Sequence, residues 1–89
     1  MKFHFTEEVA QELKQIKIKN PRLFRKIQKQ LEYFKTDPRH PSLRHHKLKG
    51  ELLERWSISI EGNNRMLYSI QDGMALFFRL GTHDQVYRK

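Results

Sequence analysis

The segment 39–49 holds the densest group of side chains in the chain that could bind an anion or move a proton. Seven of its residues are Lys, Arg or His, and three of these are His40, His45 and His46. Histidine titrates at about pH 6.5, so it suits proton transfer better than it suits mere solubility. Composition alone leaves two interpretations open, a solvated basic loop and an anion-binding segment.

A metal site is a third interpretation of these histidines, and their spacing argues against it. His45 and His46 are adjacent, and neighbouring histidines do not readily ligate one ion. The chain has no cysteine, and no well-spaced carboxylate joins the pair. We therefore expect neither a metal ion nor a cofactor.

Two arginines and a histidine that could bind a phosphate or transfer a proton lie outside this segment. Arg65 opens a strand after a polar turn, and Arg79 lies among apolar neighbours. Each is either a surface arginine or a guanidinium fork aimed at a phosphate. His83 follows a strand end, and Tyr87 comes four residues later. Either Val86 and Tyr87 simply anchor the tail, or His83 donates a proton and Tyr87 stacks on a substrate or transfers a second proton.

Together, the basic loop, the strand arginine and the tail histidine are the set that metal-independent cleavage of RNA requires. The reaction needs a base for the 2′-hydroxyl, a cation for the charge of the phosphorane, and an acid for the leaving 5′-oxygen. RNA alone supplies the 2′-hydroxyl that acts as nucleophile. A fold that brings these residues to one face of a sheet would create one basic, titratable site.

Composition limits the partners and the size of the fold. The chain has 89 residues, which suits one domain over 1–89, and 18 Lys and Arg against 10 Asp and Glu give a net charge of +8. Without cysteine, a disulfide scaffold and a cysteine nucleophile are excluded. No apolar run approaches the roughly 20 residues of a membrane span, and no secretory apolar region is present. We expect a cytoplasmic domain without membrane contact, whose partner is an anion such as nucleic acid.

Local signals predict a short strand followed by two helices. Residues 2–5 alternate polar and apolar side chains, as a strand with one buried face does. Thr6 is a suitable N-cap for a helix over 6–19. Asn20-Pro21 is suited to begin a second helix over 21–36, because proline is tolerated at the first helical position. The two helices should form an αα-hairpin.

Three strands follow, at 54–60, 65–71 and 74–82, separated by turn signals at 61–64 and Asp72-Gly73. The order β-α-α-β-β-β predicts an α+β fold, an antiparallel sheet with the helical hairpin packed on one face. Before the first of these strands we expect a loop with a short extended piece that ends at Gly50. The open face of the sheet should collect Arg55, Ser57, Ser59, Arg65 and Arg79. Most of the core should consist of Phe3, Phe5, Val9, Leu13, Ile16, Leu23, Ile27, Leu31, Phe34, Trp56, Ile58, Ile60, Leu76 and Phe78.

Three short patterns occur in the same order and spacing as in a known family. Asp37-Pro38 is followed by His46-Lys47-Leu48-Lys49-Gly50, a central strand reads Arg65-Met66-Leu67-Tyr68-Ser69-Ile70, and the last pattern is Gly81-Thr82-His83-Asp84-Gln85-Val86-Tyr87. With the chain length and element order, they resemble the RelE/ParE superfamily of bacterial toxins from toxin–antitoxin systems. The resemblance covers nearly the whole chain and is closest to the YafQ- and YoeB-type mRNA interferases.

The resemblance implies a RelE-like fold and a metal-independent, ribosome-dependent endoribonuclease that cleaves mRNA in the A site. It also implies two partners, the 70S ribosome with its ribosomal RNA and A-site mRNA, and a cognate antitoxin protein. His46 matches a YafQ-type active-site histidine, and His83 matches the catalytic histidine of the YafQ and YoeB branches. Arg65 matches the phosphate-facing arginine of RelE and YoeB, and Tyr87 falls on the terminal aromatic position.

The chain departs from the family pattern at positions that concern the general base. Where RelE carries catalytic lysines, this chain has Ser57 and Ser59, and where YafQ carries a further histidine and an aspartate, it has Ser59 and Asn63. The first choice for the base is the loop histidine that matches YafQ. The alternative is a YoeB-like carboxylate, Glu51 or Glu54.

Further basic side chains are expected to hold RNA backbone without taking part in cleavage. They are Arg25, Lys29, Arg44, His45, Lys47, Lys49, Arg55 and Arg79. Two other functions suit the same charge and fold: a ParE-like poison of DNA gyrase, which cleaves no RNA, and a non-catalytic RNA- or ribosome-binding module. Only the histidines favour the ribonuclease over these alternatives.

Overall fold

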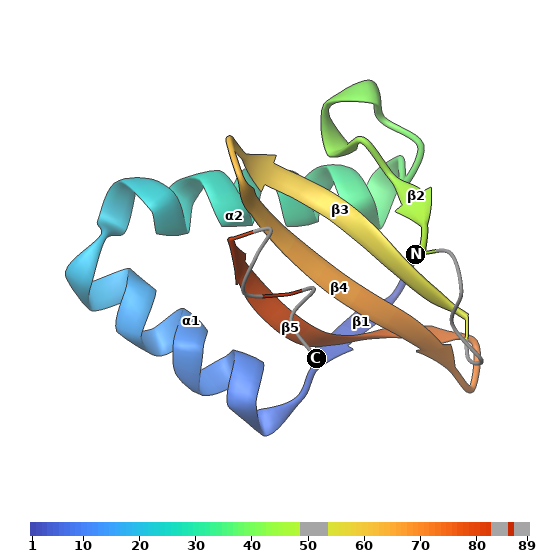
Figure 1. Cartoon of the computed structure of the whole chain (residues 1–89), viewed down its shortest axis with the longest axis horizontal. Coiled ribbons are helices and arrows are strands. Elements are labelled where there is room, and N and C mark those ends of the chain that lie inside the picture. The colour runs from blue at the N-terminus through green and yellow to red at the C-terminus, as the bar shows by residue number, and fades with distance from the viewer. Residues whose placement is uncertain (49–53, 83–85, 87–89) are drawn as a thin grey trace.

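The computed structural model describes residues 1–48, 54–82 and 86. Within these residues, two helices cover one face of a five-stranded sheet with the strand order β1-β5-β4-β3-β2 (Figure 1). The elements are β1 (Phe3–Phe5), α1 (Glu7–Lys19), α2 (Pro21–Thr36), the 3-10 helix η1 (Pro41–Leu43), β2 (His46–Lys47), β3 (Arg55–Glu61), β4 (Asn64–Gln71) and β5 (Met74–Thr82). The predicted α+β fold is confirmed. In the described part of the chain, neither helix is both long and apolar enough to cross a bilayer.

Both long helices begin at the residues that their capping chemistry predicts. The Thr6 hydroxyl accepts a hydrogen bond from the Val9 N–H, at 3.2 Å. The Asn20 side-chain oxygen accepts one from the Leu23 N–H, also at 3.2 Å. Each cap satisfies a donor that the first turn of a helix leaves unpaired. The two expected helices are therefore confirmed to within one residue.

The sheet is mixed: the three strands expected to pair antiparallel do so, and β1 joins them as a parallel strand. β1 pairs with β5 in parallel, with Phe3 opposite Ala75 and Phe5 opposite Phe77. The other neighbouring strands are antiparallel. Parallel pairing needs a long connection between the strands, which here includes both helices. The short extended piece expected to end at Gly50 corresponds to β2, which covers His46–Lys47, and Gly50 itself lies outside the described residues.

A bulge in β5 decides which of its side chains face the helices. Tyr68 lies opposite Phe77, but the preceding Leu67 lies opposite Arg79, so Phe78 is an additional residue in this strand. Without the bulge, strict alternation from Phe77 would turn Arg79 toward the core. The bulge thus allows an arginine to face outward directly before a leucine that faces inward.

The same bulge corrects two predicted core positions, Leu76 and Phe78. The buried residues of β5 are instead Ala75, Phe77 and Leu80. Strict alternation places Leu76 and Phe78 on the same face as Leu80. Because Phe78 is the additional residue, the alternation shifts by one position there, so Leu80 lies in the core while Leu76 and Phe78 do not.

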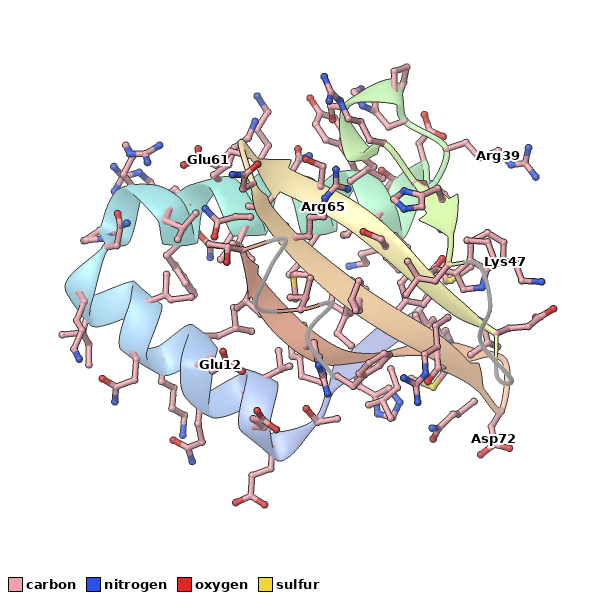
Figure 2. All side chains as sticks on the ribbon, in the orientation of Figure 1. Glu12, Arg39, Lys47, Glu61, Arg65 and Asp72 are labelled. Atoms are coloured by element: carbon pink, nitrogen blue, oxygen red, sulfur yellow. The ribbon has the colours of Figure 1, made fainter. Side chains whose placement is uncertain are left out.

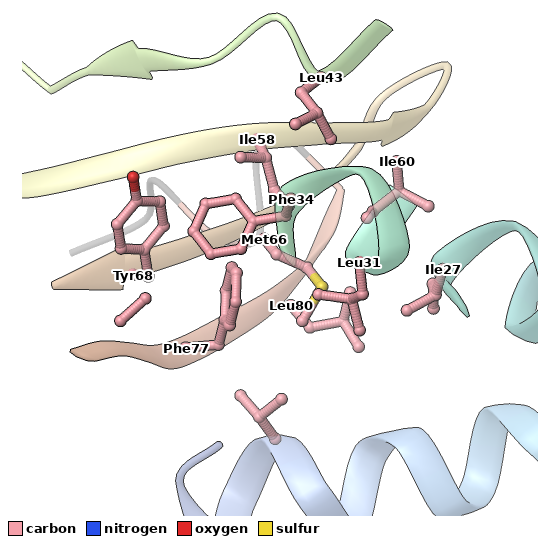
Figure 3. Close-up of a cluster of buried hydrophobic side chains, with 12 residues drawn as sticks. Ile27, Leu31, Phe34, Leu43, Ile58, Ile60, Met66, Tyr68, Phe77 and Leu80 are labelled. Carbon is pink, nitrogen blue, oxygen red and sulfur yellow. The ribbon is translucent and has the colours of Figure 1, made fainter. Parts of the chain in front are cut away.

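The core lies between the helices and the inner face of the sheet (Figure 3). Phe34 of α2 is its centre, with ring centroids 5.0 Å from Tyr68 and 5.2 Å from Phe77, both nearly edge-on. The buried cluster is Val9, Ile27, Leu31, Phe34, Leu43, Ile58, Ile60, Met66, Tyr68, Ala75, Phe77 and Leu80. The predicted Phe3, Phe5, Leu13, Ile16, Leu23 and Trp56 are partly buried and pack against it. Trp56 therefore lies at the edge of the core rather than inside it.

A buried amide attaches the basic loop to the rest of the fold. Gln30 of α2 is 1% exposed. Its Nε2 donates hydrogen bonds to the Ser42 carbonyl at 3.2 Å and to the Ser59 carbonyl at 2.9 Å. Leu43 of the same loop is buried in the core. These contacts fix η1 between α2 and β3, and the chain then enters the sheet edge as β2.

Candidate active site

The face of the sheet turned away from the helices is called the outer face below. Its polar and basic members in β3, β4 and β5 include Arg55, Ser57, Ser59, Arg65 and Arg79. His46, Ser57, Leu67 and Arg79 lie opposite one another across β2, β3, β4 and β5. Ser59 and Arg65 form the next row. Because directly opposed residues share a face, His46 belongs to the outer face as well.

His46 and Arg65 flank Ser57. The Arg65 Nη1 lies 3.5 Å from the Ser57 hydroxyl oxygen, and Arg65 is drawn over β3 in Figure 2. His46 is directly opposite Ser57 in the β2–β3 pair, and such neighbours have Cβ atoms about 4.5–5.5 Å apart. A phosphate placed over Ser57 would be within reach of both the imidazole and the guanidinium.

The backbone before β2 favours one tautomer of His46. Arg44 has a φ of 44°, in the left-handed region, and ends η1 there. Its carbonyl lies 3.3 Å from the His46 Nδ1. A carbonyl only accepts, so Nδ1 carries the proton in this contact, and in the neutral ring Nε2 is then free of hydrogen. That is the form that a general base requires.

The outer face is less open than the sequence predicts. Ser57 and Ser59 were expected to point outward to solvent, yet they are 0% and 8% exposed. Both do lie on the face away from the helices, so the predicted direction is confirmed and the predicted exposure is wrong. Arg65 is half-buried beside them. Its charge therefore acts over a floor with little water, where electrostatic contacts are stronger.

Arg79 lies at the other end of the outer face and holds Val86. Its Nη1 donates to the Val86 carbonyl at 3.3 Å, and Val86 is buried. Both line a pocket of about 370 Å³ together with Leu80, Glu8 and Glu12. Burial, and then the nearby Glu8, raise the pKa of Glu12. The acidic wall distinguishes this end of the sheet from the basic end at β2.

The alternative base Glu54 lies away from Arg65. Its carboxylate pairs with the Lys47 Nζ at 3.1 Å, and both side chains are exposed. Lys47 is opposite Trp56, on the inner side of the sheet edge. The structure therefore does not bring Glu54 and Lys47 to the outer face. Arg55 is on that face, with its guanidinium 5.0 Å from the centre of the Phe78 ring.

The remaining predicted residues fall into two groups. Arg25 and Lys29 are exposed on α2, behind the sheet as seen from the outer face (Figure 1). Lys29 Nζ lies 6.0 Å from the centre of the Tyr33 ring. The predicted roles of Lys49, Glu51, His83 and Tyr87 lie outside the described residues.

His45 faces the side of the sheet opposite to His46. Its Nε2 is hydrogen-bonded to the Tyr68 hydroxyl, and its ring stacks on Trp56. Burial, followed by electrostatic repulsion from His46 and Arg39, lowers the pKa of His45. Burial also raises the pKa of Tyr68 to about 12. At neutral pH both groups are uncharged, so a neutral hydrogen bond joins the Tyr68 hydroxyl to the imidazole, and the tautomer of His45 decides which of the two donates.

The roles of Ser57 and Trp56 around these histidines do not follow from the sequence patterns. The patterns place Ser57 on the open face and mark it as a departure from the family, whereas in the structure it lies against Arg65 and opposite His46. Trp56 was assigned to the core, whereas it supports His45. The available signal was the alternation of β3, which gives Ser57 and Trp56 opposite faces, but the partners across the sheet were not visible in it.

No protein-family model matches the chain, and no curated protein matches its sequence. Solved structures do match. The YoeB/ParE toxin from Agrobacterium tumefaciens is 20% identical, with 93% of this chain and 99% of that chain covered and a TM-score of 0.77. YafQ in the Escherichia coli DinJ–YafQ toxin–antitoxin complex is 18% identical, with 96% and 94% covered and a TM-score of 0.76. The heterotetrameric YoeB–YefM toxin–antitoxin complex from Staphylococcus aureus gives 18% identity, 93% and 97% coverage and a TM-score of 0.75.

At these identities the agreement concerns the fold. It extends over nearly the full length of this chain and of the matched chains. The predicted β-α-α-β-β-β architecture and its resemblance to YafQ and YoeB in fold are thereby confirmed. This chain has the fold that the YoeB and YafQ toxins share.

Proposed function

We propose that this chain is the toxin of a toxin–antitoxin pair and acts as a ribosome-dependent endoribonuclease on mRNA in the A site. One observation carries the proposal: His46 and Arg65 flank Ser57 on the outer face. The setting is a fold shared with YoeB and YafQ toxins. A ParE-like protein that cleaves no RNA has no use for this pair.

The proposed reaction uses the 2′-hydroxyl of the substrate and no metal ion. A base removes the hydroxyl proton, the 2′-oxygen bonds to the adjacent phosphorus, and the 5′-oxygen leaves with a proton from an acid. The products are a 2′,3′-cyclic phosphate and a 5′-hydroxyl. His46 serves as the base through Nε2, and Arg65 stabilises the negative charge that develops on the phosphorane oxygens.

Two groups complete the mechanism on the strength of the sequence resemblance. His83 is the proposed general acid, and Tyr87 the proposed stacking surface for the substrate. Exposed basic side chains, among them Arg44 and Lys47, position the protein on ribosomal RNA through backbone contacts.

A cognate antitoxin is the second proposed partner. The solved complexes hold YoeB with YefM and YafQ with DinJ. The net charge of +8 suits an acidic, amphipathic segment that folds as it binds. Expression of this chain alone should arrest growth, and coexpression with the antitoxin should restore it.

The deciding experiment adds the purified protein to a translation extract and maps mRNA ends by primer extension. Codon-phased cuts that require ribosomes, and a cyclic phosphate on the 5′ fragment, would support the proposal. His46→Ala should lose most cleavage, whereas Lys14→Gln, an exposed charge change on α1, should keep it. Ribosome binding without cuts would instead indicate a non-catalytic module, and trapped gyrase–DNA complexes would indicate a ParE-like poison.

A further inference from the structure

A second basic site lies at the inner side of the β2 edge, where the proposed cleavage reaction makes no use of it. A pocket of about 500 Å³ is lined by Arg39, His40, Pro41, Arg44, His45 and Trp56. This volume is within the range of about 300–1,000 Å³ that small-molecule sites occupy. Among the described residues, no Asp or Glu lines it.

One part of the pocket wall is aromatic. The His45 and Trp56 rings stack with centroids 5.0 Å apart and an angle of 27° between their planes. Tyr68 lies 5.7 Å from the His45 ring and 6.5 Å from the Trp56 ring, so the three near-parallel rings form a triangle. The Tyr68 hydroxyl is hydrogen-bonded to His45, which fixes the imidazole in place. Trp56 is only half-buried. A fixed and accessible aromatic surface is what an unstacked nucleobase binds in single-stranded RNA.

The other part of the wall is cationic. Arg39 and Arg44 are both exposed, and Figure 2 shows Arg39 extending from the loop beyond β2. Two guanidinium groups beside an aromatic wall offer donors for phosphate oxygens next to a surface for a base. His40 also lines the pocket, with its ring stacked on Tyr33 at 3.8 Å. The loop is therefore held to α2 as well as to β3.

We propose that this pocket binds one unpaired RNA nucleotide, with the base against the His45–Trp56 stack and the phosphate between Arg39 and Arg44. The inference deepens the proposed function and rests on it for the identity of the RNA partner. His45 and His46 are consecutive, so the pocket and the candidate active site are separated only by the width of β2. An RNA strand that crosses this edge would place a nucleotide in the pocket while its neighbouring phosphate lies on the outer face.

Trp56 provides a direct readout because it is the one tryptophan of the chain. Titration of the intact protein with AMP or UMP should quench its fluorescence with saturation. Adenosine has the base but no phosphate, and inorganic phosphate has no base, so each should bind at least about tenfold more weakly than AMP. The indole N–H signal in NMR spectra gives a second readout for a base that binds without quenching.

Charge variants link the signal to the pocket. The double variant Arg39→Gln/Arg44→Asn should weaken AMP binding about tenfold or more, since each charge-assisted contact is among the stronger hydrogen bonds. Asparagine is chosen at 44 because it tolerates the left-handed backbone there. Lys14→Gln, which removes the same kind of charge on α1, should bind AMP like the parent protein.

Each result separates this proposal from the cleavage reaction. If no nucleotide changes either signal, or if phosphate binds as tightly as AMP, the nucleotide pocket is wrong even when mRNA is cleaved. If a poly-glutamate peptide binds and AMP does not, the surface receives an acidic protein partner instead. If AMP binds and no RNA is cut, the pocket stands and the proposed catalytic function fails.

Discussion

Ser57 shows how a small side chain can organise a site without reacting. Its hydroxyl accepts the Arg65 contact, and its strand position places His46 directly opposite. With serine rather than lysine at this position, the proposed cleavage leaves the cationic role to Arg65. In that proposal, stabilisation of the transition state depends on the guanidinium.

Arg65→Ala should therefore lower the cleavage rate by about 10²–10³-fold, the usual effect of removing one preorganised charge contact to the transition state. Arg65→Lys should restore only part of the rate, because a point charge cannot reproduce the planar fork. Single-turnover cleavage on programmed ribosomes measures both. Circular dichroism should show that the variants remain folded. Cleavage by Arg65→Ala at the parent rate would remove Arg65 from the mechanism.

His45 should make the stability of the protein depend on pH. Because burial and the nearby positive charges lower its pKa below the ordinary 6.5, the unfolded chain takes up the proton more readily than the folded one. The stability that neutral His45 contributes is present above about pH 6.5 and is lost as the pH falls through the lower, folded pKa. Urea unfolding from about pH 7.5 down to 5 should show this decline in the free energy of unfolding.

The comparison with His45→Phe isolates that contribution. Phenylalanine keeps a ring against Trp56 but cannot be protonated, so the decline should be shallower in this variant. His4→Gln, a change on the exposed side of β1, should keep the parent slope. Equal slopes for all three proteins would show that His45 does not set the pH dependence.

At the scale of the elements, the sequence predicted what depends on neighbours along the chain. The caps gave both helices, and Asp72-Gly73 gave the β4–β5 turn, where φ values of 53° and 75° confirm the left-handed conformations such a turn needs. The parallel β1–β5 pair and the bulge at Phe78 depend on residues far apart in sequence, so local alternation could not reveal them.

In the candidate site, too, features set by local sequence were predictable and features set by distant residues were not. Residue types and family patterns pointed to His46 and Arg65. The structure places His46 opposite Ser57 across the β2–β3 pair and the Arg65 guanidinium next to the Ser57 hydroxyl. The burial of Ser57 and the exposure of Trp56 depend on packing across the sheet. Neither can be read from the period of a single strand.

Gln30 is the residue that connects the helical layer to the loop and the sheet, so its loss should affect more than one element. In Gln30→Leu, the Ser42 and Ser59 carbonyls lose a buried donor, which should lower the free energy of unfolding by about 1–3 kcal/mol. Gln28→Leu, an exposed position on the same helix, should change it little. Chemical denaturation of both variants tests this. Equal stability of the two would mean that the buried amide contributes nothing to holding the loop.

For the whole molecule, the small core limits the free energy of unfolding, so the loss of one buried side chain removes a large part of it. A chain of 89 residues typically has a free energy of unfolding of about 4–13 kcal/mol. Phe34, fully buried at the centre of the cluster, should cost about 3–5 kcal/mol when replaced by alanine. Trp56→Ala should cost less, because the half-buried indole leaves less apolar surface to be lost from the core.

Thermal unfolding followed by circular dichroism measures both losses. The parent should have the highest melting temperature, Trp56→Ala a lower one, and Phe34→Ala the lowest. A lower melting temperature for Trp56→Ala than for Phe34→Ala would show that the His45–Trp56 stack, and not the Phe34 cluster, is the principal source of stability.

The adjacency of His45 and His46 also restricts how β2 can pair with β3. One histidine faces the inner side of the sheet edge and the other faces the outer side. A shift of the β2–β3 register by one residue would exchange the two environments and disturb both at once, whereas a shift by two residues would preserve which side each histidine faces. The loop before β2 lies on the surface, where length usually varies freely. Insertions in that loop should therefore be tolerated as long as they leave the register of β2 unchanged.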